Sequence, residues 1–189
     1  MELKTKRLVL RELKESDAQD IADNANNVNV SKYLLIVPYP YSLKDAKDFI
    51  KHTASAAKKN PRTGYELGIT LKTEGKVIGI IGLGSVNAFQ ETGTVGYWLG
   101  EKYHRNGYMT EAFGKILDFG FMELNLRKVK VSAFADNTAS NRLIRDKMEF
   151  KQEGCRIEHL RDKATGTLHD ENIYGLLRRD YIDRKSSNS

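Results

Sequence analysis

The sequence has a single cysteine, Cys155, among its 189 residues. One cysteine cannot close an internal disulfide and supplies no pair of thiolates for a metal. This usage is typical of a reducing compartment and argues against a structural zinc site, so we expect no metal cofactor. We interpret Cys155 as an ordinary strand residue.

The sequence also lacks a long apolar run. Its longest apolar run, Val77 to Val86, is short and rich in glycine, whereas a membrane-spanning helix needs about 20 apolar residues. The first seven residues, M-E-L-K-T-K-R, contain no apolar core of a secretion signal. We therefore expect a cytoplasmic protein that does not contact a membrane.

Proline and low-complexity sequence are scarce. There are three prolines, and the one low-complexity run is 185–189, which we expect to be a disordered tail. Hydrophobic residues make up 40% of the chain and charged residues 30%, a composition typical of globular proteins. We predict one domain over 1–184 with a sizeable core.

No single block of basic residues explains the net charge of +6. The charge is compatible with an anionic ligand, an acidic protein substrate, proximity to RNA, or solubility alone. Because the basic residues are scattered and do not alternate with aromatic residues, direct nucleic-acid binding is the weaker inference.

What the sequence does contain is alternation typical of strands. Tyr65 to Lys72 alternates strictly between apolar and polar residues, and the turn T-E-G-K joins it to an apolar, glycine-rich strand from Lys76 to Val86. Thr94 to Leu99 follows, so three consecutive antiparallel strands are expected. Other predicted strands are Arg7 to Leu13, Arg127 to Ala135, Lys151 to Leu160 and Leu168 to Leu177.

Helices are predicted where apolar residues recur every three or four positions. Ser16 and Gln19 form a predicted capping box for the first helix, and Ser42 with Asp45 caps the second. Thr110 begins a third helix that we expect to continue to about Leu124, and Asp136 or Asn137 caps a fourth.

The stretch between the third strand and the third helix is typical of a phosphate site. Gly107 is the only small residue of its turn, and a helix that begins there presents unpaired backbone N–H groups at the positive end of its dipole. Such a helix start binds phosphate.

Two motifs resemble those of the GCN5-related N-acetyltransferases (GNAT), in particular the RimJ/RimL branch. The segment R-N-G-Y-M-T-E-A is similar to the family's pyrophosphate loop, [Q/R]-x-x-G-x-[G/A], with Gly107 at the central glycine, although His104 and Met109 depart from the pattern. In the family's N-x-x-S-x₇-G-F, the asparagine, serine and phenylalanine correspond to Asn137, Ser140 and Phe150. Glu149 replaces the glycine, and the spacing from Ser140 is one residue longer. The match runs in order along nearly the whole chain.

The resemblance implies an α/β fold. Its central mixed, mostly antiparallel sheet of about seven strands would splay like a V and be flanked by about four helices. It also implies a site for acetyl-CoA, with the diphosphate on the amides of Arg105 to Thr110 and the pantetheine near Trp98 and Leu99. Asn137 would hold the pantetheine arm or serve only as a helix cap. The full set of implied cofactor-binding residues is Trp98, Leu99, His104, Arg105, Asn106, Gly107, Tyr108, Met109, Thr110, Asn137, Ser140 and Arg142.

Acetyl transfer to an amine needs an oxyanion donor, an acid for the leaving thiolate and a base for the amine. The resemblance implies the main-chain amide of Leu99 as donor and the hydroxyl of Ser140 as acid. For the base, the candidates are Glu91 or Glu66 acting through water. Either residue is equally well interpreted as an ordinary solvent-exposed charge. We interpret Glu111 as structural, paired with Lys115.

The predicted acceptor pocket lies in the tyrosine-rich segment 33–42. In the branch that the chain resembles, this region binds the acceptor, which implies Tyr33, Tyr39 and Tyr41, although the same tyrosines are also typical of aromatic packing. We expect an N-acetyltransferase, monomeric or homodimeric, whose acceptor is a protein N-terminus, for example of a ribosomal protein, or a small amine. The alternative is a CoA-binding or RNA-associated module without turnover.

Overall fold

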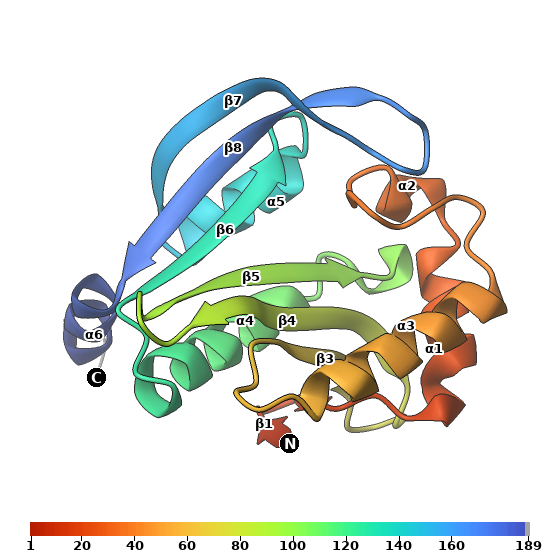
Figure 1. Ribbon diagram of the computed structural model, residues 1–189, viewed down its shortest axis with the longest axis horizontal. Helices are drawn as coiled ribbons and strands as arrows, with labels where there is room; N and C mark the ends of the chain where they lie inside the picture. The colour runs from red at the N-terminus through yellow and green to blue at the C-terminus, as the bar shows by residue number, and fades with distance from the viewer. Residues whose placement is uncertain (188–189) are drawn as a thin grey trace.

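A computed structural model describes residues 1–187 and has the mixed α/β architecture predicted from the sequence (Figure 1). Its single sheet has eight strands in the order β1-β2-β3-β4-β5-β6-β8-β7. The strands are β1 (Glu2–Lys4), β2 (Leu8–Arg11), β3 (Tyr65–Leu71), β4 (Val77–Asn87), β5 (Thr92–Leu99), β6 (Lys128–Phe134), β7 (Lys151–Arg161) and β8 (Leu168–Leu177). The described residues also form six α-helices, which are α1 (Ala18–Ala25), α2 (Val28–Ser31), α3 (Leu43–Ala57), α4 (Tyr108–Asp118), α5 (Thr138–Arg142) and α6 (Arg178–Ser187).

One strand and two helices are additional to those predicted. The strand β1 has three residues and α2 has four, which is too short for a periodic pattern to be seen. The helix α6 buries only Tyr181, so it lacks the apolar stripe by which a helix is predicted. Residues 185–187 of the expected disordered tail belong to α6, and 188–189 lie outside the described residues.

The sheet opens at its centre, between β5 and β6. These two strands are parallel, as expected for a strand-helix-strand unit, and every other neighbouring pair is antiparallel. Their pairing runs from Thr92 opposite Lys128 to Val95 opposite Val131. Beyond Val95 the strands diverge, as Figure 1 shows, and this divergence is the V-shaped splay that the resemblance implied.

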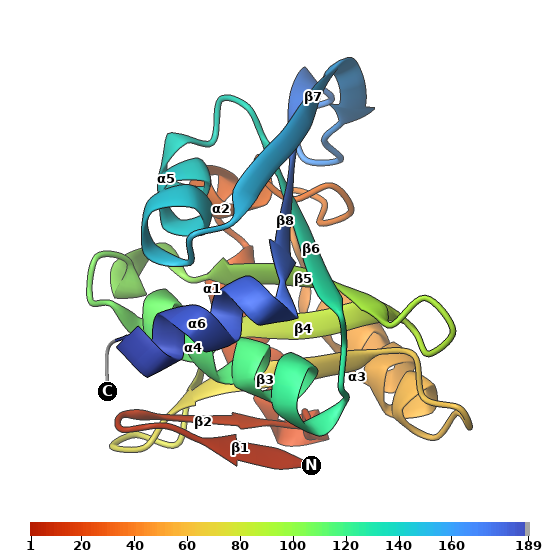
Figure 2. The ribbon, with the colours of Figure 1, turned by 90° about the vertical axis from the view of Figure 1, so that its left-hand side faces the viewer.

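Each face of the sheet is covered by different helices, and Figure 2 shows α3 and α4 on opposite sides of the strands. On the side of α4, here called the α4 face, the core contains Leu67, Ile69 and Phe113. On the side of α1 and α3, the α1/α3 face, Ile80 packs with the helices and Trp98 adjoins them. Because side chains alternate along a strand, neighbouring residues of β5 point to different faces.

The helix α4 begins at Gly107, which has φ +75° and acts as its N-cap. Phe113, Ile116 and Leu117 are fully buried, and burying each contributes about 1.5 to 3 kcal/mol. The predicted continuous helix to Leu124 differs from the structure, because the chain widens into a π-helical turn at Phe119–Glu123. None of the helices in residues 1–187 has the length and hydropathy to cross a membrane.

Two predicted helix starts have different outcomes. The Ser42–Asp45 capping box is confirmed, since each residue accepts a hydrogen bond from the backbone N–H of the other. The box predicted at Ser16 and Gln19 is wrong. A 3₁₀ turn precedes α1 there, and Asp17 accepts a hydrogen bond of 2.7 Å from the backbone N–H of Lys14. The buried pair that Asp17 forms with Arg11 fixes this arrangement.

Candidate active site

A cleft with a volume of about 780 Å³ lies where β5 and β6 part. Its walls come from β5, β6, the loop before α4, the start of α4, α5 and the segment around α2. The predicted site residues that line it are Tyr33, Trp98, Leu99, His104, Arg105, Gly107, Tyr108, Met109, Thr110, Asn137 and Ser140. The predicted residues outside its lining are Tyr39, Tyr41, Glu91, Asn106 and Arg142.

The open edge of β5 presents main-chain groups to the cleft. The backbone N–H of Gly100 donates to the carbonyl oxygen of Ile78 at 2.9 Å, and in the regular antiparallel register Trp98 opposite Ile80 is the next hydrogen-bonded pair. The N–H and C=O groups of Tyr97 and Leu99 therefore point the other way, toward β6. Since β6 pairs with β5 only as far as Val95, the N–H of Leu99 faces the cleft.

His104 ties the loop before α4 to the end of β5. Its Nε2 lies 2.8 Å from the carbonyl oxygen of Leu99. A carbonyl oxygen only accepts, so Nε2 carries the hydrogen in this tautomer. The bond occupies the C=O of Leu99 and leaves the N–H of the same residue available to a ligand.

The loop itself is held by Arg7, a residue that we did not predict to lie near the site. Its guanidinium donates to the carbonyl oxygen of Asn106 at 2.9 Å and lies 4.6 Å from the centre of the Tyr108 ring. The side chain of Asn106 donates within the same loop, to the carbonyl oxygen of His104 at 3.0 Å. The loop is thereby fixed with its Gly107 turn at the start of α4.

Glu111 is structural, as predicted, but its partners are different. Its carboxylate accepts hydrogen bonds from the Thr5 hydroxyl and from both the backbone and the side chain of Arg7. Burial alone would raise the pKa of this carboxyl, yet these hydrogen bonds outweigh burial and hold the pKa below its ordinary value. The clamp joins the turn between β1 and β2 to α4.

A pair of hydroxyl groups lies on the α4 face of the cleft. Ser140 Oγ and Tyr97 Oη are 2.6 Å apart, and Asn137 caps α5 by accepting a hydrogen bond from the N–H of Ser140 at 3.1 Å. Burial raises the pKa of Tyr97, whose ring packs 5.2 Å from that of Phe113. Sequence reasoning missed Tyr97, although the alternation of β5 was a signal that could have found it.

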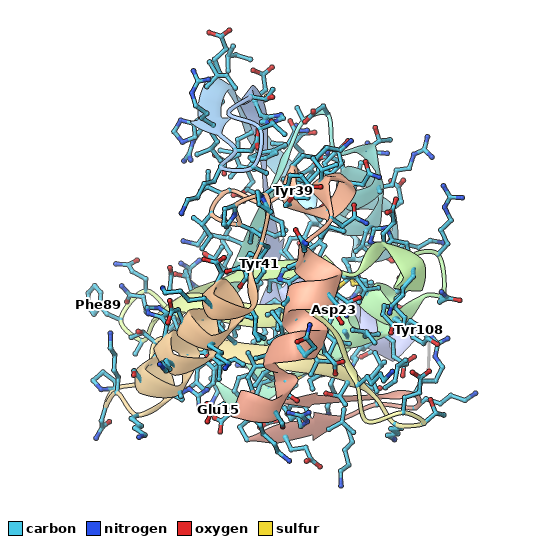
Figure 3. All side chains as sticks on the ribbon, turned by 90° about the vertical axis from the view of Figure 1, so that its right-hand side faces the viewer. Glu15, Asp23, Tyr39, Tyr41, Phe89 and Tyr108 are labelled. Atoms are coloured by element: carbon cyan, nitrogen blue, oxygen red, sulfur yellow. The ribbon has the colours of Figure 1, made fainter. Side chains whose placement is uncertain are left out.

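The three tyrosines predicted to bind the acceptor are separated in the structure. Tyr33 lines the cleft. Tyr41 is only 9% exposed and belongs to the core beneath α1 and α3, where burial raises its pKa to about 12. Tyr39 is 47% exposed in the segment between α2 and α3, as Figure 3 shows.

The two candidate bases are also far apart in the fold. Glu91 is in the turn before β5, at the opposite end of that strand from Leu99, and its carbonyl oxygen accepts from the N–H groups of Arg127 and Lys128. Glu66, on β3, lines the cleft, and burial raises the pKa of its carboxyl. The structure brings Glu66, and not Glu91, to the site.

Comparisons with known proteins agree with this geometry. A family model described as an acetyltransferase (GNAT) domain matches residues 7–148. Two proteins named as uncharacterized N-acetyltransferases are similar along nearly their whole length. One is p20 of Bacillus licheniformis, 29% identical over 179 residues that cover 95% of this chain and 97% of p20. The other is YoaA of Bacillus subtilis (strain 168), 30% identical over 176 residues that cover 93% of this chain and 96% of YoaA.

A solved structure has the same fold. It is described as RimL, the ribosomal L7/L12 alpha-N-protein acetyltransferase, in complex with coenzyme A. It superimposes with a TM-score of 0.82 at 19% sequence identity, and the match covers 94% of this chain and 98% of that one.

Proposed function

Because the chain belongs to the acetyltransferase (GNAT) family, we propose that this enzyme uses acetyl-CoA and transfers the acetyl group directly to a primary amine. The observation that carries the proposal is the open edge of β5. The N–H of Leu99 points into the cleft there, close along the chain to a braced loop that ends at a helix N-terminus. The free N–H can serve as an oxyanion donor, and the helix N-terminus can bind a diphosphate.

The residues present suit the parts of acetyl-CoA. The backbone amides of 105–110, at the start of α4, suit a diphosphate, since Gly107 adds no side chain and φ +75° turns its neighbours toward one point. The edge of β5 at Trp98 and Leu99 suits the amide groups of pantetheine, with Asn137 on the other wall. Arg105 lines the cleft as a further cation for phosphate, whereas Arg142 lies outside the lining.

Two of the three chemical tasks fall to the open edge of β5 and to the hydroxyl pair on the α4 face of the cleft. The N–H of Leu99 would stabilise the oxyanion that forms when the amine attacks the thioester. The Ser140 hydroxyl, in its hydrogen bond with Tyr97, would donate to the departing thiolate. A thiolate is a fair leaving group near neutral pH, so we assign this donor a modest share of the rate.

For the acceptor, we propose the α-amine of a protein N-terminus. The support is the fold shared with RimL, whose name gives such a substrate, and the apolar side chains of Leu34 and Leu35 beside Tyr33 at the cleft. A small amine is the competing acceptor.

The test is release of thiol from acetyl-CoA with a panel of amines. The panel consists of peptides with free N-terminal serine or alanine, the same peptides with the N-terminus acetylated, and spermidine. We expect release with at least one free amine and none with the blocked peptides. Binding of acetyl-CoA without release for any amine would contradict the transfer and favour a CoA-binding module.

A matched pair of glycine variants tests the loop. Gly107 and Gly75 both have positive φ, +75° and +68°, so alanine strains each backbone by about 1 kcal/mol. Gly107→Ala also brings a methyl group 3.4 Å from the guanidinium of Arg7, whereas nothing lies within 4 Å at Gly75. We expect Gly107→Ala to weaken acetyl-CoA binding at least about tenfold, a loss of about 1.4 kcal/mol. Gly75→Ala should bind like the wild type, and equal affinities for all three proteins would contradict the proposed diphosphate site.

A further inference from the structure

On the α1/α3 face, two neighbouring glycines leave part of the sheet without side chains of its own, between Glu66 and the edge of β5 at the cleft. Glu66 on β3 is opposite Gly82 on β4, which is opposite Gly96 on β5. A Cβ atom at Gly82 would lie 2.1 Å from a carboxylate oxygen of Glu66, and at Gly96 it would meet nothing within 4 Å. The carboxylate of Glu66 therefore lies over Gly82, and the space beside it, above Gly96, is open.

Glu66 is also the unpaired carboxylate of the cleft. The other two that line it have partners: Glu101 accepts a hydrogen bond of 2.6 Å from Asn27, and Glu171 accepts one of 3.0 Å from Arg156. Among residues 1–187 nothing donates a hydrogen bond to the side chain of Glu66 or forms an ion pair with it. A half-buried carboxylate without a partner is costly, and a cationic ligand would offset that cost.

The position of Glu66 complements that of the hydroxyl pair. Tyr97 packs on the α4 face, whereas Glu66 and its glycines are on the α1/α3 face, with the open end of β5 between them. A thioester held at Leu99 would have the hydroxyl pair on one side of the sheet and the carboxylate on the other. Glu66 is level with Gly96, which is three residues, or about 10 Å, before Leu99 along β5. The amine attacks one face of the planar thioester carbonyl, and the α1/α3 face is the side on which the space above Gly96 is open.

We propose that Glu66 receives the acceptor as an ammonium ion, which enters over Gly96, and takes its proton through ordered water before attack. This inference rests on the proposed function and assigns its missing base. It also defines the substrate class, a primary amine that is protonated in solution and reaches the open space above Gly96.

The proton and bond changes balance. A proton passes from the ammonium nitrogen to the Glu66 carboxylate, and the neutral amine forms a C–N bond to the thioester carbon. The C–S bond then breaks, and a second proton lost by the nitrogen ends on the thiolate. Glu66 returns its proton to water, so the products are an amide, a free thiol and one proton.

Other titratable groups share a cavity with Glu66. On the side of α3, a pocket of about 270 Å³ contains Glu12, Lys58 and Arg62, of which Glu12 and Arg62 pair with each other at 2.7 Å. Across the cleft are Glu101, Glu171 and His104. The raised pKa of Glu66 arises from its burial, so it should titrate as a single carboxyl above the ordinary range.

The experiment compares Glu66→Gln with Glu74→Gln, a control in the exposed turn that ends the same strand. The probe is the best free-amine peptide of the panel. We expect Glu66→Gln to lower kcat/KM at least about 100-fold, in the range of a lost general base, with unchanged affinity for acetyl-CoA. The acidic limb of the wild-type pH profile, set by Glu66, should disappear in this variant, and Glu66→Asp should recover part of the rate. Glu74→Gln should match the wild type.

A second variant separates position from charge. Gly82→Ala keeps the carboxylate but forces it aside, because the new methyl group overlaps its oxygens, so it should lose activity while still binding acetyl-CoA. If the wild type acetylates an amine and Glu66→Gln does so equally well at every pH, Glu66 is not the base, although the transferase assignment stands. If the wild type acetylates no amine, both proposals are overturned.

Discussion

At the scale of single residues, the hydroxyl pair of Tyr97 and Ser140 gives the most direct prediction. The two oxygens are 2.6 Å apart. Tyr97→Phe and Ser140→Ala each remove one hydroxyl of the pair that is proposed to donate a proton to the departing thiolate. We expect each to lower kcat about 10- to 100-fold, toward the low end for acid catalysis. Because the groups act as a unit, the double variant should be no slower than the slower single variant. Multiplied losses in the double variant would show that the two hydroxyls act separately.

Asn137 and Glu111 give a second prediction, which is a ranking. Asn137 lines the cleft and caps α5, whereas the side chain of Glu111 reaches the loop before α4 through Arg7. We expect Asn137→Ala to weaken acetyl-CoA binding more than Glu111→Ala does, as measured by calorimetry. Asn137→Ser separates helix capping from ligand binding. The serine still caps α5, so the variant loses only the side-chain amide that would bind the ligand. The reverse ranking would mean that Asn137 is no more than a cap.

Residue identities at the site were only partly predictable. The turn at Gly107 and the resemblance of two motifs to the acetyltransferase (GNAT) family predicted Leu99, His104, Gly107 and Ser140, all of which line one cleft. Arg7 could not be predicted, because it is about 100 positions away along the sequence from the loop that it holds. Glu66 could be preferred to Glu91 as the candidate base only once the register of β3, β4 and β5 was known.

At the scale of secondary-structure elements, a buried charge cluster fixes the end of the β7–β8 hairpin. Asp162 accepts hydrogen bonds from the backbone N–H groups of Thr165 and Thr167 and faces His169 at 3.2 Å. His169 also lies 3.1 Å from Asp136, which is next to Asn137 in the chain. The cluster thus links the hairpin to the start of α5.

This cluster predicts a pH dependence of stability. Burial would raise the pKa of Asp162, but its hydrogen bonds outweigh burial and lower it from 3.8 to about 2. The stabilisation is therefore complete above about pH 4 and is lost as the pH falls toward 2, an effect of about 1 to 2 kcal/mol. The free energy of unfolding in urea should be lower for Asp162→Asn than for the wild type at pH 5, and the difference should shrink by pH 2.5. A constant difference would contradict the assignment.

Elements were predicted best where they are long and periodic. The seven predicted strands are present with ends shifted by at most a few residues, since alternation reports the buried face directly. The capping box predicted at Ser16 was wrong because Asp17 forms an ion pair with Arg11. The helix propensity of the local sequence does not predict this contact. The π-helical turn at Phe119–Glu123 buries Phe119, Gly120 and Phe121, and the helical periodicity of this stretch did not predict it.

At the scale of the whole molecule, binding of acetyl-CoA should stabilise the fold. A ligand at 100 times its dissociation constant adds about 2.7 kcal/mol, which raises the melting temperature of a chain of this length by about 5 to 10 °C. Thermal unfolding with and without acetyl-CoA measures this shift in melting temperature. Desulfo-CoA and adenine are the control ligands. No shift at saturating acetyl-CoA would contradict a site that joins both halves of the sheet.

The splay between β5 and β6 is the feature on which the proposed chemistry depends, and the most direct test is a crystal structure with acetyl-CoA bound. We predict the diphosphate on the amides around Gly107, and the thioester carbonyl oxygen within hydrogen-bond distance of the N–H of Leu99. Acetyl-CoA bound elsewhere, or a cleft closed by side chains at that N–H, would contradict the proposed site.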